Sequence, residues 1–252
     1  MLLARSRYCS LNILLTGHLG FIGKTLFDRL WLCGHNVHVL DIKDGMDITT
    51  CSFVYDDIDL VIHLAGKSGV RESIKSPEEY WLTNVEGTKR LFNAFGEHTR
   101  ILYASSSSAY EPSLNPYAAS KFIIEHMAPK NSLGMRFHTV YSNTPREGMF
   151  LYKLINGELE YVTNHSRDFI HIEDLCDAIE LVMDSNLNGI LDIGTGESIE
   201  IQTLAPGKTI RLNTTHERIC TKANIEILQN LGFKPKYNVR KFLTNKQLGT
   251  II

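Results

Sequence analysis

The sequence predicts an α/β fold, a doubly wound parallel sheet with a small, reduced C-terminal lobe. Two observations predict it. An apolar run ending at Leu15 leads into a turn with glycines at positions 17, 20 and 23, after which residues 24–31 are apolar at helical spacing. Strand-like apolar runs then alternate with helix-like segments along most of the chain, which is typical of parallel strands joined by right-handed crossovers.

The glycine turn has the spacing of a dinucleotide-binding, Rossmann-type unit. In such a unit the first glycine permits the tight turn, the second lets the backbone approach a pyrophosphate, and the third lets helix and strand pack closely. The helix N-terminus then faces the phosphates. The alternative is a glycine-rich turn with a purely structural role. The residues expected to contact the cofactor here are Gly17, Gly20, Phe21, Ile22 and Gly23.

A second strand, predicted at residues 35–40, ends at Asp41, eighteen residues after Gly23. A carboxylate at this position can accept hydrogen bonds from the adenosine ribose, which favours NAD over NADP. The alternative is a solvated turn aspartate, since residues 41–45 have a turn-like composition. Lys43 lies close enough to offset the charge of Asp41 if this turn folds back.

Further elements follow in alternation. The continuous apolar run 60–66 predicts a buried parallel strand that ends in small residues, where a ligand finds room. Residues 78–98, with Pro77 near the start, predict a helix, and residues 100–104 a strand that leads into four serines. We expect helices at 116–127, 174–183 and 223–231, strands at 133–137 and 189–194, and a less regular region at 141–168. Ligands lie outside the carboxyl ends of such strands, which is where Gly17, Asp41, Ala65 and serines 105–108 fall.

Composition narrows the class of protein. The 252 residues carry a net charge of −2 and are 21% charged, so nothing indicates nucleic-acid or anionic-membrane binding. No apolar run approaches the roughly eighteen residues that a membrane span needs. The five cysteines form no close CxxC pair and the ten histidines show no ligand spacing, so we expect a reducing, cytoplasmic environment and no metal. We interpret residues 1–10 as a frayed extension.

The chemistry is expected at the start of the predicted helix 116–127. Tyr117 and Lys121 are four residues apart and share one helix face. A phenol has an unperturbed pKa of about 10, so it needs nearby positive charge to act as a base at neutral pH. Lys121 can supply that charge, and an oxidised nicotinamide ring would add to it. A hydroxyl of the serine run could orient a substrate hydroxyl beside the phenol. The alternative is an ordinary surface pair.

An ordered set of motifs supports a family resemblance. The set consists of TGHLGFIG (16–23), HLAG (63–66), Asn84 within NVEGT, the serine strand end, YAASK (117–121) and RDFIHIEDL (167–175). Together these motifs resemble the extended short-chain dehydrogenase/reductase family, in its NAD-dependent nucleotide-sugar epimerase/dehydratase branch. The resemblance covers roughly residues 11–237. It implies a Rossmann core at 11–140 joined by 168–194, and a substrate-binding lobe from 141–167 and 195–252.

The resemblance implies a role for each matching residue. Tyr117 would be the acid/base, Lys121 would hold the ribose and lower the pKa of the tyrosine, and Ser106 would assist. Ser106 is chosen because residues 103–110 resemble the family's SSSxxVY strand end, and Ser105 is the nearest alternative. The remaining cofactor contacts implied are Asp47 and Ile48 at the adenine, and Leu64, Ala65, Gly66 and Asn84.

Substrate contacts are implied at four positions, namely Ser106, Ser107, Arg71 and Arg167. The loop 69–74, which contains Arg71, resembles that of glucuronate-type 4-epimerases. Arg167 matches the arginine that reaches the substrate diphosphate. The alternative for Arg167 is a salt bridge to Asp168 or Glu173.

Two departures from the family pattern refine the expected activity. Dehydratases of this branch carry Asp-Glu after the hydroxyl residue, but here Ser107 and Ser108 stand there, which disfavours 4,6-dehydration. The chain is also shortened after Lys121 and between Thr144 and Arg167. We expect an NAD-dependent nucleotide-sugar epimerase acting at carbon 4, and a homodimer. The alternatives are a nucleotide 4-keto-sugar reductase that uses NAD(P)H and a catalytically silent nucleotide-binding protein.

Overall fold

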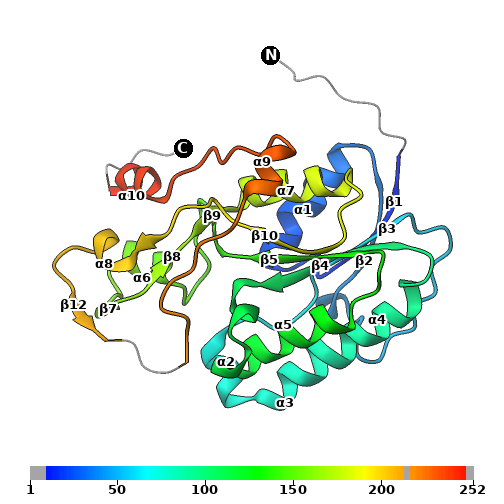
Figure 1. Ribbon diagram of the computed structural model, residues 1–252, viewed down its shortest axis with the longest axis horizontal. Helices are drawn as coiled ribbons and strands as arrows, with labels where there is room; N and C mark the ends of the chain where they lie inside the picture. Colours follow the sequence, from blue (N-terminus) through cyan, green and yellow to red (C-terminus); the bar gives the residue numbers. More distant parts are fainter. Residues whose placement is uncertain (1–9, 213–215, 248–252) are drawn as a thin grey trace.

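Six parallel strands form the central sheet of the computed structural model, which describes residues 10–212 and 216–247. The strand order is β10-β5-β4-β3-β1-β2 (Figure 1). The bounds are β1 Asn12–Thr16, β2 Asn36–Leu40, β3 Leu60–His63, β4 Arg100–Ser106, β5 Ser132–Phe137 and β10 Gly189–Ile193. Because β1 lies between β2 and β3, the order reverses beside β1, which is where such sheets leave a crevice for a ligand.

Helices cover both faces of this sheet (Figure 1). One layer contains α1 (Phe21–Leu32) and α7 (Ile172–Met183), and the other contains α2 (Val70–Lys75), α3 (Pro77–Tyr80), α4 (Thr88–Phe95) and α5 (Pro116–Met127). Side chains alternate between the two cores: Ile13 and Leu15 pack in the cluster that includes α1 and α7, whereas Leu14 packs with residues of α4 and α5. Burial on both faces explains the continuous apolar runs, and the predicted fold class is confirmed.

A smaller set of elements gathers to one side of the sheet (Figure 1). It contains three two-stranded pairings, β6 with β9, β7 with β12 and β8 with β11. Their bounds are β6 Thr139–Tyr141, β7 Tyr161–Thr163, β8 Ser166–Arg167, β9 Phe169–His171, β11 Ile199–Glu200 and β12 Thr209–Arg211, with helices α6 Phe150–Ile155, α8 Ile201–Leu204 and α10 Val239–Gln247. A separate apolar cluster, which includes Tyr141, Phe169 and Phe242, packs α6 and α10 against these strands.

Some elements differ from the sequence-based prediction. The helix predicted at 78–98 is divided by a π-helical segment, Trp81–Gly87, between α3 and α4. The helix predicted at 223–231 is the shorter α9 (Glu226–Asn230), and the N–H groups of Ala223 and Asn224 before it donate to buried carboxylates. Helix α10 was not predicted. Residues 1–9 of the predicted frayed extension lie outside the described residues, as do positions 213–215 and 248–252 of the predicted lobe. Within the described part of the chain, no helix is long and apolar enough to cross a membrane.

Candidate active site

The glycine turn connects β1 to α1 at the carboxyl edge of the sheet. Gly17 has φ +76°, and a Cβ atom there would lie 2.7 Å from the backbone nitrogen of Ala65. A Cβ atom on Gly23 would lie 2.0 Å from the carbonyl oxygen of Gly17. Gly17 thus allows both the turn and its approach to β3, and Gly23 allows the helix to pack on the turn. Because α1 begins at Phe21, its first N–H groups face this edge without intrahelical acceptors.

Asp41 is buried at the end of β2 and linked to the same turn. Its carboxylate accepts the N–H groups of Leu19 at 3.0 Å and Lys43 at 2.9 Å. The interpretation of Asp41 as a solvated turn residue is therefore wrong. The turn after β2 does fold back, since Lys43 Nζ donates to the carbonyl oxygen of Leu19 at 3.0 Å. A carboxylate and an ammonium group thus both lie beside the glycine turn.

The two residues predicted at the adenine follow this turn. One Asp47 oxygen accepts hydrogen bonds from both the N–H and the hydroxyl of Thr49 at 2.8 Å. Ile48 is buried under the π-helical segment, where a Cβ atom on Gly87 would lie 2.8 Å from its Cγ2 atom. This contact fixes the chain after β2 against the layer that carries Asn84.

Asn84 joins the end of β3 to helix α5. Its Oδ1 atom accepts the N–H of Lys67 at 2.7 Å, and its Nδ2 atom donates to the Lys67 carbonyl and to Ser120 Oγ, both at 3.0 Å. A Cβ atom on Gly66 would lie 3.0 Å from Asn84 Oδ1 and 3.6 Å from Lys121 Nζ. The small residues Ala65 and Gly66, which follow Leu64 after β3, therefore let this loop lie close to Lys121.

Tyr117 and Lys121 occupy successive turns of α5, which Asn115 caps by accepting the N–H of Ala118 at 2.8 Å. Lys121 is only 6% exposed and its Nζ atom donates to the Ala104 carbonyl at 2.7 Å. Burial lowers the pKa of Lys121 to about 8, although Glu125 acts in the opposite direction. Burial raises the pKa of Tyr117, while a hydrogen bond with Ser106 and the charge of Arg146 oppose the increase. The surface-pair alternative is thus wrong.

The structure separates the two candidate serines. Ser105 Oγ donates to Glu125 at 2.5 Å, and the same carboxylate accepts Arg136 Nε at 2.8 Å. Ser106, in contrast, is the serine that hydrogen-bonds the Tyr117 phenol. Its hydroxyl also accepts the N–H of Ser108 at 3.1 Å. The geometry therefore favours Ser106 over Ser105 as the hydroxyl beside Tyr117.

Two residues that sequence reasoning did not single out approach Tyr117. Tyr80 packs edge-on with a ring-centroid distance of 6.2 Å, and its hydroxyl donates to the Ser68 carbonyl at 2.8 Å. Arg146 donates to Ser68 Oγ at 3.0 Å. In the sequence, Tyr80 is one of the apolar residues at helical spacing and resembles an ordinary core residue. Arg146 lies in an irregular loop, where no sequence pattern indicates a functional residue.

Tyr80 and Arg146 line a polar cavity of about 420 Å³. Its other lining residues are Gly66, Lys67, Ser68, Glu72, Ser76 and Glu79. Arg71, predicted as a substrate contact, is exposed on α2 and is not among these lining residues. Its predicted role remains a prediction.

Arg167 does not form the salt bridge that the sequence suggested as an alternative. Its acidic partner is Glu217, with Nη2 to Oε2 at 2.9 Å, and not Asp168 or Glu173. Asp168 is fully buried and accepts four other donors, and Glu173 pairs with Arg29. Burial lowers the pKa of Arg167, against the effect of Glu217.

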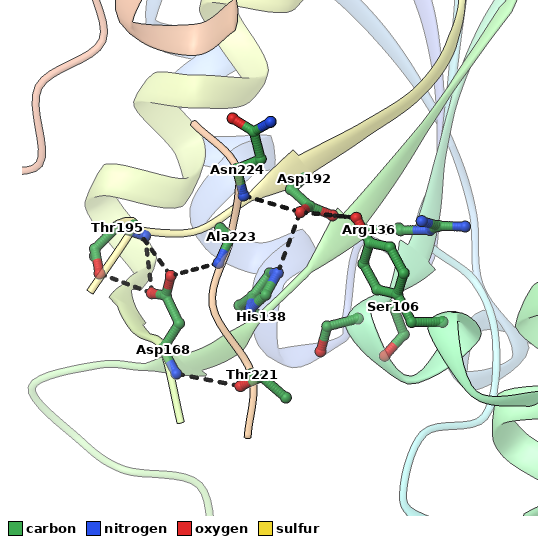
Figure 2. Close-up of polar contacts among 12 residues, drawn as sticks. Ser106, Arg136, His138, Asp168, Asp192, Thr195, Thr221, Ala223 and Asn224 are labelled. Carbon is green, nitrogen blue, oxygen red and sulfur yellow. Dashed lines mark hydrogen bonds and ion pairs between the residues drawn. The ribbon is translucent and has the colours of Figure 1, made fainter. Parts of the chain in front are cut away.

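Buried carboxylates at the ends of β8 and β10 fix the chain that follows Arg218 (Figure 2). Asp168 accepts the N–H groups of Thr195 at 2.8 Å and of Ala223 at 3.0 Å, and its own N–H donates to Thr221 Oγ1 at 3.2 Å. Asp192 accepts the N–H of Asn224 at 3.0 Å. Residues 221–224 are thus held against the ends of β8 and β10.

These features fit a bound dinucleotide. The glycines form a turn that side chains would obstruct, Asp41 offers an ordered carboxylate beside it, and Lys121 lies buried where the loop after β3 approaches α5. Across residues 10–212 and 216–247 no group of three or more metal-ligating side chains is found.

Comparisons with known proteins agree with this geometry. Protein CapI of Staphylococcus aureus is 32% identical over 228 aligned positions, which cover 67% of this chain and 68% of CapI. A UDP-glucose 4-epimerase of Streptomyces lividans is 26% identical over 268 aligned positions, 81% of each protein. The solved structure of MoeE5 in complex with UDP-glucose and NAD has a TM-score of 0.82 and 28% identity, and covers 93% of this chain and 97% of that one.

The family comparison extends over most of the sheet. The model of the NAD dependent epimerase/dehydratase family matches residues 13–194, from β1 to the end of β10. The prediction of NAD as cofactor agrees with the family's description and with the NAD-bound structure of MoeE5. The chain therefore belongs to the NAD dependent epimerase/dehydratase family, of the extended short-chain dehydrogenase/reductase type.

Proposed function

We propose that this protein is an NAD-dependent epimerase that inverts carbon 4 of the sugar in a nucleotide-diphosphate sugar, through a transient 4-keto sugar. The observation that carries the proposal is that Tyr117 interacts with Ser106, packs against Tyr80 of the cavity wall and lies one helical turn from buried Lys121. A phenol in this position can remove a proton from a sugar hydroxyl and return it.

Each residue has a distinct task in this reaction. Ser106 orients the C4 hydroxyl toward the Tyr117 oxygen, which takes the proton as the carbon is oxidised and gives it back at the end. The Lys121 ammonium, one helical turn away, adds positive charge that favours the phenolate. The Ser106 hydrogen bond and the charge of Arg146 oppose the effect of burial on the pKa of Tyr117. NAD, when bound along the glycine turn, supplies the oxidation of carbon 4 and then its reduction on the opposite face.

The residues around Ser106 favour epimerisation over dehydration. Elimination of water requires a further acid and base beside the sugar, but the positions after Ser106 carry the hydroxyl groups of Ser107 and Ser108. The transient 4-keto sugar also has to rotate within the site so that its other face meets the cofactor. The cavity of about 420 Å³ next to Tyr80 offers space for this rotation. These observations support the epimerase assignment within the family.

The nucleotide is expected to lie toward the smaller lobe. We propose residues 141–167, 195–212 and 216–247 as the described part of the substrate lobe, with Arg167 on the diphosphate and Ser107 beside the sugar. Arg167 presents a planar guanidinium suited to phosphate oxygens. Relatives named for UDP-glucose support UDP-sugars as the first substrates to test.

We also propose a homodimer in the reducing cytoplasm. Trp81 and Leu82 are 47% and 54% exposed side by side on the π-helical segment, and a second copy would cover them. The described cysteines Cys33, Cys51, Cys176 and Cys220 are all free thiols. Sedimentation equilibrium with wild type and Trp81→Ala tests the dimer, and a monomeric wild type would contradict it.

A product assay separates the epimerase from the reductase. Purified protein is incubated with UDP-glucose, UDP-glucuronic acid and UDP-N-acetylglucosamine, with catalytic NAD and no added reductant, and the products are identified by proton NMR. An epimerase yields the C4 epimer without net change in NADH absorbance. A second incubation contains NADH and a nucleotide 4-keto sugar. Stoichiometric consumption of NADH there, together with no epimer formation in the first incubation, would identify a reductase instead.

A further inference from the structure

A short segment of the chain, residues 216–221, connects the Rossmann core to the smaller lobe beside the candidate active site. On the core side, Asn115 Nδ2 donates to the His216 carbonyl at 2.9 Å, and Arg218 donates to the Ser107 carbonyl at 2.9 Å and to Glu111 at 3.0 Å. On the lobe side, the N–H of Ser166 donates to the Ile219 carbonyl at 2.8 Å. We call residues 216–221 the connecting segment.

The connecting segment surrounds the guanidinium of Arg167 with acceptors of its own. Arg167 Nη2 donates to Glu217 Oε2 at 2.9 Å, and Nη1 donates to the carbonyl of Arg218 at 2.8 Å. Arg218 also donates to the carbonyl of Ser107, the residue next to Ser106. Arg218 therefore links Arg167 to the strand end that carries Ser106. The guanidinium that we propose to bind the diphosphate is thus already paired with an internal carboxylate.

Two properties of this ion pair indicate that it can be exchanged. Glu217 keeps about a third of its side chain exposed, whereas the Arg167 side chain is 13% exposed. The carboxylate is therefore the partner that water and ligands can reach. A guanidinium in such surroundings is stabilised more strongly by a doubly charged diphosphate than by one carboxylate, because charge-assisted hydrogen bonds strengthen with the charge of the acceptor.

We propose that Glu217 is a resident carboxylate that competes with the substrate diphosphate for Arg167, so that binding of the nucleotide sugar breaks the Glu217–Arg167 ion pair. This inference rests on the proposed role of Arg167 at the diphosphate. It makes Glu217 a residue that sets substrate affinity, and predicts that anions too weak to displace the carboxylate are not bound through Arg167.

The rival account gives Glu217 the opposite effect. If Glu217 only orients Arg167 for the substrate, its loss weakens binding. If it competes, its loss strengthens binding. The sign of the change in affinity therefore distinguishes the two accounts, and a purely structural role does not produce tighter binding.

The test is calorimetric titration of the NAD-saturated protein with UDP and GDP, using whichever diphosphate binds wild type more tightly. We expect Glu217→Gln to bind it about three- to tenfold more tightly, the range of a partly exposed ion pair. Glu158→Gln, which removes an exposed carboxylate after α6, is the charge-matched control and should stay within about twofold of wild type. Glu217→Asp, whose shorter carboxylate reaches Arg167 less well, should fall between Glu217→Gln and wild type.

A second pair of variants separates the failure of this inference from the failure of the Arg167 assignment. In an Arg167→Ala background, Glu217→Gln should no longer change diphosphate affinity, because the competition has been removed. Unchanged or weaker binding by Glu217→Gln in the wild-type background would overturn the role of Glu217, while leaving Arg167 in place if Arg167→Ala alone weakens binding. Unchanged binding by Arg167→Ala alone would remove both assignments.

Discussion

The Nζ atom of Lys121 donates to the carbonyl oxygen of Ala104 at 2.7 Å, in the strand that ends at Ser106. This bond fixes the ammonium of Lys121 to the same strand that carries the serine hydroxyl, while Tyr117 lies one turn earlier on α5. The three groups are therefore positioned by one strand and one helix. Their relative geometry depends on the packing of α5 against β4 and not on a flexible loop.

Replacement of Tyr117 by Phe should abolish most turnover and leave NAD binding intact. The phenol provides the acid/base group, and its removal typically costs about 10²- to 10⁴-fold in rate. The ring of Phe still packs against Tyr80. Turnover of the identified substrate and cofactor titration are measured for Tyr117→Phe and for Tyr55→Phe, a tyrosine that packs against Phe95 away from the site. Near wild-type turnover by Tyr117→Phe would disprove its role.

Acid should destabilise the fold through buried His63. This histidine is 2% exposed, its Nδ1 atom lies 2.7 Å from Thr16 Oγ1 and its Nε2 atom 2.9 Å from Thr88 Oγ1. Burial, with the charge of Lys121, lowers the pKa of His63 to about 3, below the ordinary value of 6.5. Because the unfolded chain then binds the extra proton, the free energy of unfolding falls as the pH drops from 6.5 toward 3.

Urea unfolding between pH 4 and 8 measures this effect. His63 alone should contribute a slope of up to about 1.4 kcal/mol per pH unit below its unfolded pKa. His63→Gln should reduce the slope, although its starting stability is lower. His98→Gln, which replaces an exposed histidine, should leave the slope unchanged. A slope as steep in His63→Gln as in wild type would show that His63 is not buried in its neutral form. Part of the slope remains in every variant, because burial also lowers the pKa of His171 to about 4.

The sequence was sufficient to predict the fold and to identify Tyr117, Lys121 and Ser106, which the structure brings together, as the proposed chemical centre. Parallel strands buried on both faces leave continuous apolar runs, and the glycine turn and YAASK have local spacings that a sequence displays directly. It was insufficient where a contact joins distant segments. The Glu217–Arg167 pair spans 50 residues, and Tyr80 and Arg146 meet near Tyr117 only through tertiary packing. The sequence did not predict helix α10, which is short and whose apolar residues pack on the smaller lobe.

The cofactor preference should depend on both Asp41 and Lys43. The Asp41 carboxylate lies beside the glycine turn, where it would repel a 2′-phosphate by about 1–4 kcal/mol at 4 Å. Lys43 folds back to the same turn and would reduce that repulsion. Titration of the apo-protein with both cofactors should show tighter binding of NAD, a smaller preference in Asp41→Ala, and a larger one in Lys43→Ala. Equal affinity of wild type for NAD and NADP would contradict the role of Asp41.

Arg167→Lys separates an enzyme that holds a nucleotide sugar from a protein that binds only the dinucleotide. Lysine retains the positive charge but cannot present two parallel donors to phosphate oxygens, and it also loses several of the contacts to the connecting segment. If Arg167 holds the diphosphate, binding of UDP or GDP to the NAD-loaded protein should weaken by about 1.5–3 kcal/mol, the scale of a charged hydrogen bond, while NAD affinity stays the same. If Arg167 serves only the ion pair with Glu217, thermal stability should fall slightly and diphosphate binding should not change. Lys208→Met, which removes an exposed charge from the same lobe, controls for a general loss of positive potential. Calorimetric titration and a thermal melt of each variant give the two readouts separately, and unaltered binding of the diphosphate that wild type accepts would exclude Arg167 from the substrate site.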